Sequence, residues 1–259
     1  MTEFMGLTKN LMHEKWKLMN WILGIDLLAL VAYFILRFIL GGYKTSLNPF
    51  PNYSFAVFAV SLSIVNIVAV IMLSRNNERV LTSNNYRLIP ATETKLYFSN
   101  LLTTLLGFVY LQILESIIGG ILYGVSVKGA VDMTPSGSGS FSMLMAAVFV
   151  MILGALALWS GVTVVHLLIN WIGGFLPFGR QKFVSFILYL LVTWLSLTII
   201  NFATGNVFKL IFHDGQFYQF SVNTMSSALW TSAGVLFVWV VIFAAINIYL
   251  LKRWTETIR

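Results

Sequence analysis

Long, almost uninterrupted apolar stretches dominate the chain and are separated by short polar segments. A helix rises about 1.5 Å per residue, so about 20 mostly apolar residues cross a hydrocarbon layer of roughly 30 Å. Six stretches reach this length. Inside lipid they are predicted to be helices, because a helix satisfies its own backbone hydrogen bonds. The predicted spans are residues 21–41, 55–73, 96–123, 141–168, 183–202 and 228–251.

Composition narrows the class of protein further. Hydrophobic residues make up 58% of the 259 residues and charged residues only 10%, against roughly 45–50% and about 25% in an average soluble domain. An ordinary soluble enzyme is therefore excluded. The chain has no cysteine, which excludes disulfides, thiolate metal sites and a cysteine nucleophile. The sequence predicts an all-α polytopic membrane protein, with one transmembrane domain over residues 1–259.

The distribution of basic residues predicts the orientation of the spans. Twelve lysines and arginines lie in the two termini and in the second and fourth connections, whereas three lie in the other connections and Arg37 is inside the first span. Basic loops remain cytoplasmic, so both termini and the second and fourth connections are predicted to face the cytoplasm. The net charge of +7 is thus assigned to orientation rather than to nucleic-acid binding. The twelve are Lys9, Lys15, Lys17, Arg75, Arg79, Arg87, Lys95, Arg180, Lys182, Lys252, Arg253 and Arg259; the three are Lys44, Lys128 and Lys209.

Residues 4–20, before the first span, have the pattern of an amphipathic helix. At 100° per residue, three methionines and a tryptophan share one face, and most basic residues share the other; Lys15 does not fit this division. The pattern predicts a helix lying in the membrane interface. The alternative is a basic juxtamembrane tail. The apolar face is Met5, Met12, Trp16 and Met19, and the polar face is Lys9, His13, Lys17 and Asn20.

The longest hydrophilic stretch is segment 74–95, between the second and third spans. Pro90 disfavours helix at the residue before it, and Thr92 is a suitable N-cap for the third span. The segment is therefore predicted to contain a short helix, a turn and a new helix start. From its residues alone, it is either a solvated loop carrying orientation charges or a short helix that offers a docking surface on the cytoplasmic face.

The Asn77-Glu78-Arg79 sequence, followed by Leu-Ile-Pro-Ala-Thr-Glu at residues 88–93, resembles ABC-2-type transporter permeases. The resemblance implies that segment 77–88 is a coupling helix, which fits a cleft on a separate ATP-binding subunit. Glycine often follows the Glu-Arg pair in that family, whereas Val80 stands here. The coupling candidates are Asn77, Glu78, Arg79, Tyr86, Arg87 and Pro90.

The same resemblance has further implications. ATP and Mg²⁺ would be bound by the partner, so this chain is expected to hold no cofactor or metal and to have no catalytic residues. A second permease chain, identical or related, would complete the path. The family has short re-entrant helices where residues 206–220 lie; the alternative here is an aromatic loop at the membrane interface.

Ionisable groups inside the spans are functional candidates, because they are costly in lipid. Glu115 lies in the third span, one helical turn from Gln112. These two residues either line a path for a cationic substrate or bond a neighbouring helix. Asp26 and Arg37 are roughly 16 Å apart along their helix, too far to pair. A lone histidine, His166, is interpreted as a hydrogen-bonded packing residue.

The predicted function is a permease subunit that exports an amphipathic peptide, a lipid-like molecule or a drug. One alternative is a stand-alone immunity or binding protein for a membrane-active peptide. Another is an intramembrane enzyme built around Glu115 and His166. The sequence contains no zinc-binding His-Glu-x-x-His, no Gly-x-Ser-x-Gly and no phosphate-binding P-loop. Gly120 and Gly124 form a small-x-x-x-small pair, which favours close helix approach.

Overall fold

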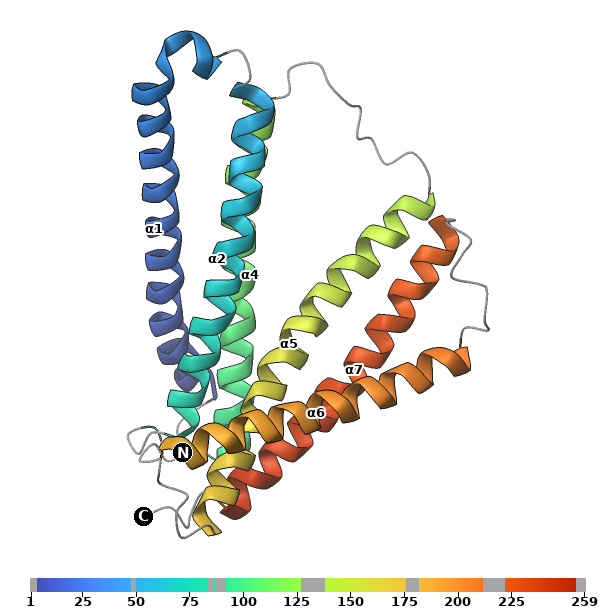
Figure 1. Cartoon of the computed structure of the whole chain (residues 1–259). Coiled ribbons are helices and arrows are strands. Elements are labelled where there is room, and N and C mark those ends of the chain that lie inside the picture. The colour runs from blue at the N-terminus through green and yellow to red at the C-terminus, as the bar shows by residue number, and fades with distance from the viewer. Residues whose placement is uncertain are drawn as a thin grey trace. The chain divides into compact units, whose positions relative to one another are not determined.

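The computed structural model describes residues 4–47, 50–82, 86, 92–126, 138–175, 182–211 and 222–254. Helices account for every one of these residues except Thr92, and none of them forms a strand. Six of the helices are long and apolar enough to cross a membrane, which confirms the predicted all-α membrane class (Figure 1). The helices are α1 (Phe4–Leu47), α2 (Phe50–Thr82), α4 (Glu93–Ser126), α5 (Ser138–Phe175), α6 (Lys182–Ile211) and α7 (Val222–Trp254).

The helices extend past the predicted apolar spans. α2 continues to Thr82, so the first part of the hydrophilic segment is helix, and α4 begins at Glu93. The predicted N-cap is present: the Thr92 hydroxyl accepts the backbone N–H of Lys95 at 3.4 Å, and the Thr92 carbonyl accepts that of Leu96 at 3.0 Å. Polar residues at the ends of a span continue its helix, because leaving the apolar stretch does not itself break the backbone hydrogen-bond ladder.

The interfacial helix predicted over residues 4–20 is not a separate element. These residues are helical, but they continue without a break into the first span as part of the 44-residue α1. The predicted apolar face does not coincide with the face buried inside the protein: Met5 is 78% exposed and Trp16 is 46% exposed, whereas Met19 is fully buried. The buried face instead follows a spacing of three or four residues, which keeps side chains on one side of a helix. Its members are Leu7, Leu11, Lys15, Met19 and Ile22.

The helices form two compact units, and the single transmembrane domain over residues 1–259 stays a prediction. Unit 1 contains α1, α2 as far as Val80, and α4 from Phe98 onward. Unit 2 contains α5, α6 and α7, together with Thr92–Tyr97 at the beginning of α4. The helices of unit 1 run alongside one another in Figure 1.

Small residues allow close approach inside unit 1. A Cβ atom built on Gly107 of α4 would lie 3.7 Å from the Cβ atom of Lys15 on α1. One built on Gly119 would lie 2.9 Å from Cε1 of the buried Phe58 on α2. Gly120 belongs to the predicted small-x-x-x-small pair, but a Cβ atom built on it would have nothing within 4 Å. The glycine at the α2–α4 contact is therefore Gly119.

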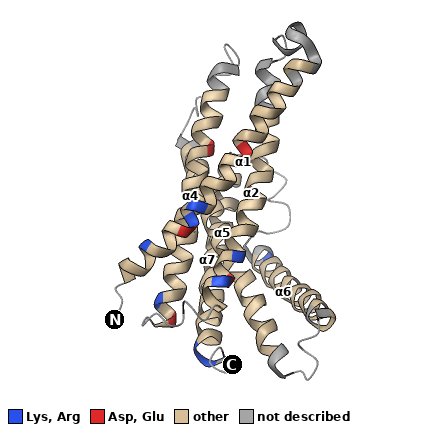
Figure 2. Cartoon of the chain, turned by 90° about the vertical axis from the view of Figure 1, so that its left-hand side faces the viewer, with Lys and Arg blue, Asp and Glu red and all other residues tan. Residues whose placement is uncertain are grey.

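In unit 2, α5 packs against α7. A Cβ atom on Gly161 of α5 would lie 3.4 Å from the Phe243 ring of α7, and the Ser142 and Ser226 hydroxyl groups lie 3.0 Å apart. α5 carries no Lys, Arg, Asp or Glu, and most residues of the described helices are uncharged (Figure 2). α6 is joined to α7 by a hydrogen bond of 3.1 Å from the Trp239 indole N–H to the Thr204 hydroxyl.

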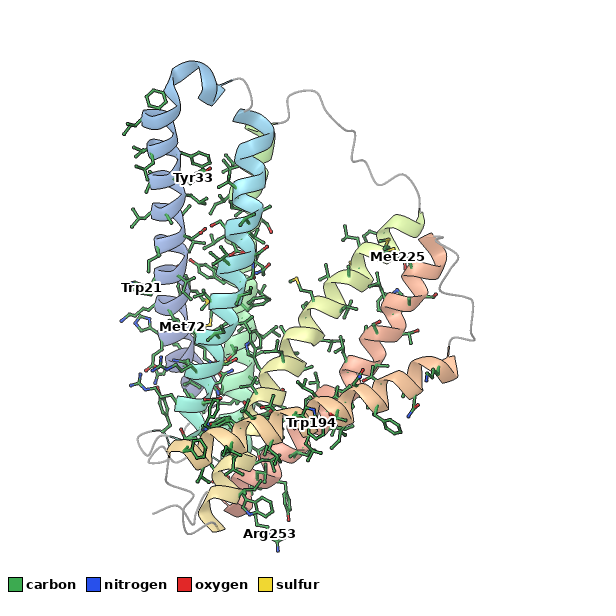
Figure 3. All side chains as sticks on the ribbon, viewed as in Figure 1. Trp21, Tyr33, Met72, Trp194, Met225 and Arg253 are labelled. Atoms are coloured by element: carbon green, nitrogen blue, oxygen red, sulfur yellow. The ribbon has the colours of Figure 1, made fainter. Side chains whose placement is uncertain are left out.

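Large apolar side chains project outward from both units. Trp21 of α1 is 62% exposed and Trp194 of α6 is 68% exposed; both are labelled in Figure 3. Exposed apolar patches of this extent are unusual in soluble monomers. They suit a surface covered by lipid, in agreement with the composition.

Substitution at the α2–α4 contact tests this packing. We expect Gly119→Val to lower the free energy of unfolding by about 1–3 kcal/mol relative to Gly120→Val, because the added methyl groups overlap the Phe58 ring. Thermal unfolding in detergent micelles measures the difference. Phe58→Leu should recover part of the loss in the Gly119→Val background. Equal stability of the two glycine variants would contradict the contact.

Candidate functional site

A fully buried lysine lies at the centre of unit 1. Lys15 of α1 has 0% exposure, and its ammonium nitrogen donates to oxygens of α2 and α4. We call these oxygens, with the lysine, the Lys15 cage. The distances from Nζ are 2.5 Å to Thr104 Oγ1, 2.6 Å to the Asn100 carbonyl, 2.7 Å to Asn100 Oδ1, 2.9 Å to Thr103 Oγ1 and 3.0 Å to Asn77 Oδ1.

The Lys15 cage surrounds the side-chain nitrogen with oxygens, and none of its hydrogen-bond partners among the described residues is acidic. An ammonium group has three N–H donors, so the five oxygens share them. All five belong to neutral groups: two side-chain amides, two hydroxyl groups and one backbone carbonyl. A buried charge is tolerated only when its hydrogen bonds are made. The five dipoles replace the water that the ammonium group has lost.

The cage joins the two helices on either side of the hydrophilic segment. Asn77 is near the end of α2, and Asn100 is near the start of α4. They also bond each other directly, since the Asn100 amide donates to the Asn77 carbonyl at 3.3 Å. Thr104 Oγ1 donates to Asn77 Oδ1 at 2.5 Å. The end of α2 and the start of α4 are the two stems of the hydrophilic segment. Both stems are therefore held to α1 at one point.

The residue next to Lys15 contacts the segment itself. The hydroxyl group of Tyr86 lies 2.9 Å from both carboxylate oxygens of Glu14 and donates to them. Partial burial, followed by this hydrogen bond and the negative charge of Glu14, raises the pKa of Tyr86, while Arg79 opposes the rise. Tyr86 therefore stays a neutral donor at physiological pH. Glu14 thus holds the segment and Lys15 holds its two stems, and both residues lie in one turn of α1.

Other contacts fix the same part of α1 on α4. The Thr8 and Ser99 hydroxyl groups lie 2.9 Å apart. The rings of Trp16 and Tyr110 have centroids 5.0 Å apart, and the Tyr110 hydroxyl donates to Asn20 at 2.8 Å. These contacts explain why residues 4–20 follow α4 instead of forming an independent helix.

The predicted coupling residues lie in different environments. Asn77 is 3% exposed and belongs to the Lys15 cage, so its side chain faces the interior of unit 1. Glu78 is half-buried, whereas Arg79 is exposed. Arg75, one helical turn before Arg79, is exposed as well. The candidates Arg87 and Pro90 lie outside the described residues.

The two predicted pathway residues, Gln112 and Glu115, are brought together with Asn66 of α2. The Asn66 side-chain amide donates to Glu115 Oε2 at 3.0 Å. The Gln112 amide donates to the same oxygen at 3.4 Å and also to Asn66 Oδ1. Nearby in unit 1, the Ser61 hydroxyl donates to the carboxylate of Asp26. Glu115 thus bonds a neighbouring helix, which is one of its two predicted roles.

The remaining candidates are His166, Arg37 and the predicted re-entrant region. His166 of α5 forms a hydrogen bond of 2.7 Å with the Tyr189 hydroxyl of α6, in agreement with a packing role. The Arg37 side chain, like residues 212–221 of the predicted re-entrant region, is outside the part of the chain that the structure describes. Within that part, no group of three or more His, Cys, Asp or Glu side chains could hold a metal ion.

Sequence reasoning missed most of the cage. Lys15 was predicted to be one of the twelve cytoplasmic basic residues and did not fit the polar face of residues 4–20. Its spacing from the buried Leu11 and Met19, four residues on either side, was the available signal. A lysine at that spacing needs oxygens on the facing helix, and α4 carries Asn100, Thr103 and Thr104 within its first twelve residues.

No protein-family model, no curated protein and no solved structure matches this chain. The interpretation of the site therefore rests on its geometry and on the sequence pattern.

Removing the buried ammonium group tests the Lys15 cage. We expect Lys15→Met to lower the free energy of unfolding by about 1–3 kcal/mol, because the cage oxygens lose their shared donor inside the protein. The matched control is Lys17→Met, at an exposed position, with an expected change below about 0.5 kcal/mol. Thermal unfolding in detergent micelles measures both.

A triple variant separates the cage from a general effect of the substitution. Thr103→Val and Thr104→Val remove the two cage hydroxyl groups, whose oxygens lose their N–H donor in Lys15→Met, and should recover part of the stability lost in that variant. A Lys15→Met protein as stable as Lys17→Met would show that the cage does not stabilise unit 1.

Proposed function

We propose that this chain is the membrane-spanning subunit of an ATP-driven exporter of the ABC-2 type. In this proposal, the segment between α2 and α4 faces the cytoplasm and couples the chain to a separate ATP-binding subunit. The observation that carries the proposal is the attachment of both stems of that segment to α1 through Lys15. The resemblance of residues 77–79 and 88–93 to the coupling region of such permeases supports the same reading.

The mechanical argument follows from this attachment. A loop that only connects two helices moves independently of the rest of the bundle, whereas force applied to a clamped loop moves the helices that clamp it. α1 has 44 residues and is therefore about 66 Å long. A displacement of segment 77–88 would be carried through Glu14 and Lys15 into α1, and through the stems into α2 and α4. In this proposal, ATP hydrolysis on the partner supplies the energy. This chain transmits the movement to its helices and forms part of the path.

The exposed face of α2 offers a surface for the partner. Arg75 and Arg79 are four residues apart, so they lie on one side of the helix, and both are exposed. The buried Leu73, Asn77 and Val80 lie on its interior side. A pair of arginines favours a partner groove lined by carboxylates, because opposite charges speed association and select the register.

The rest of the assembly follows from the same proposal. ATP and Mg²⁺ are bound by the ATP-binding subunits, and a second permease chain contributes the other half of the path. The excess of basic residues in the termini and in the second and fourth connections supports cytoplasmic termini in a bacterial plasma membrane. A path with few charges suits an amphipathic peptide, a lipid-like molecule or a drug.

Co-purification tests the proposal directly. Tagged chain extracted from native membranes in mild detergent should recover a P-loop ATPase, and the complex should hydrolyse ATP. We expect Arg75→Gln combined with Arg79→Gln to reduce the recovered ATPase at least about tenfold, which corresponds to about 1.4 kcal/mol of binding. The matched control is Lys9→Gln combined with Lys17→Gln, which removes two exposed basic residues from α1 and should leave recovery unchanged.

The result also separates the alternatives. A wild-type chain that recovers no P-loop ATPase, yet protects cells from a membrane-active peptide, would favour the stand-alone immunity protein. Equal loss of recovery in the two double variants would show that total charge, rather than the α2 face, governs the association.

A further inference from the structure

A buried carboxyl group in unit 1 is bonded on only one of its two oxygens. Glu115 of α4 is 4% exposed. Its Oε2 accepts hydrogen bonds from the side-chain amides of Asn66 and Gln112. Its Oε1 is buried and has no hydrogen-bond partner among the described residues.

Among the described residues, the groups that face Glu115 offer no positive charge. From α2 it meets Asn66, whose amide does not titrate, and from its own helix it meets Gln112. From α1, the carboxyl group of Asp26 is near enough to interact with it electrostatically, and Asp26 itself is bonded to Ser61. The Lys15 cage is more distant, since its nearest member on α4, Thr104, is 11 residues from Glu115, or about 16 Å.

Burial in these surroundings favours the neutral acid. An ionised carboxylate without a cation or water is far more costly in an apolar interior than a neutral carboxylic acid with one unbonded O–H group. The two amide donors stabilise Oε2 in either form, whereas a carboxylate would also leave charge on the unbonded Oε1. A second acidic group nearby adds to the cost of ionising both.

We propose that Glu115 is a proton-binding site inside the membrane-spanning bundle. The proton is held on Oε1 as an O–H bond while α2 and α4 pack against each other. Separation of the two helices admits water, the O–H bond breaks, and the proton passes to that water, leaving the carboxylate. Opening of this contact is therefore linked to proton release and closure to proton uptake, whether or not the chain works with an ATPase.

Tight packing between α2 and α4, one helical turn from Glu115, supports this link between helix separation and proton release. Gly119 follows Glu115 by four residues on the same side of α4, and it meets Phe58 of α2. The α2–α4 contact is thus tight directly beside the carboxyl group. A small separation there changes the surroundings of Glu115 from protein to water.

Infrared spectroscopy of the full chain in lipid vesicles tests the proposal. Protonated carboxylic acids have a carbonyl-stretch band distinct from the bands of carboxylates. At neutral pH, we expect the wild-type protein to show such a band, shifted on transfer to D₂O and absent from Glu115→Gln. Glu14→Gln is the matched control at an exposed carboxylate and should leave the band unchanged. A wild-type minus Glu115→Gln difference containing only carboxylate bands would overturn the proposal.

A second variant keeps the test decisive if Glu115→Gln does not fold. Gln112→Leu removes one amide donor from the carboxyl group, so the acid band should move to higher frequency. A spectrum of Gln112→Leu with an unchanged acid region would also overturn the proposal. Because the band is measured without ATP or a partner, it is independent of the co-purification experiment.

Discussion

The burial of one ammonium group is the constraint on which the arrangement of unit 1 depends. Lys15 has no exposure, so its charge is stable only where enough oxygens surround it. Those oxygens come from the end of α2 and the first turns of α4, and they can surround Nζ only in one register of the three helices. Apolar side chains alone would leave that register weakly specified, because one row of leucines packs much like the next.

Unit 1 contains two polar layers with an apolar layer between them. The Lys15 cage forms the first layer, and Asn66, Gln112 and Glu115 form the second. The two layers are separated by 11 residues along α2, from Asn66 to Asn77, and by at least 8 residues along α4, from Thr104 to Gln112, or roughly 16 and 12 Å. The intervening buried residues include Met19, Ala69, Leu73, Phe108 and Leu111. The first layer holds the hydrophilic segment to α1, and the second joins α2 to α4 within the bundle, so each has a distinct mechanical role.

Apolar length was enough to predict the helices, because every span has to satisfy its backbone within itself. The N-cap at Thr92 and the bond between Glu115 and a neighbouring helix were likewise predictable from local chemistry. The sequence predictions failed where they depended on which side of one helix packs against another helix. Residues 4–20 were assigned to the membrane surface by their own amphipathic pattern, but the partner of their buried face is α4, more than 80 residues later. Gly120 was predicted with Gly124 from the small-x-x-x-small spacing, which does not show which side of α4 meets α2.

From the sequence alone follow the membrane class, the six apolar helices and the position of the hydrophilic segment, since each depends on composition and on neighbours within a few residues. Only the tertiary structure decided which side of α1 is buried, that Lys15 lies inside a cage, and that Asn77 faces the interior rather than a partner. The physical reason is that a buried charge is stabilised by oxygens from distant parts of the chain. Their convergence on one nitrogen exists only after the helices have packed.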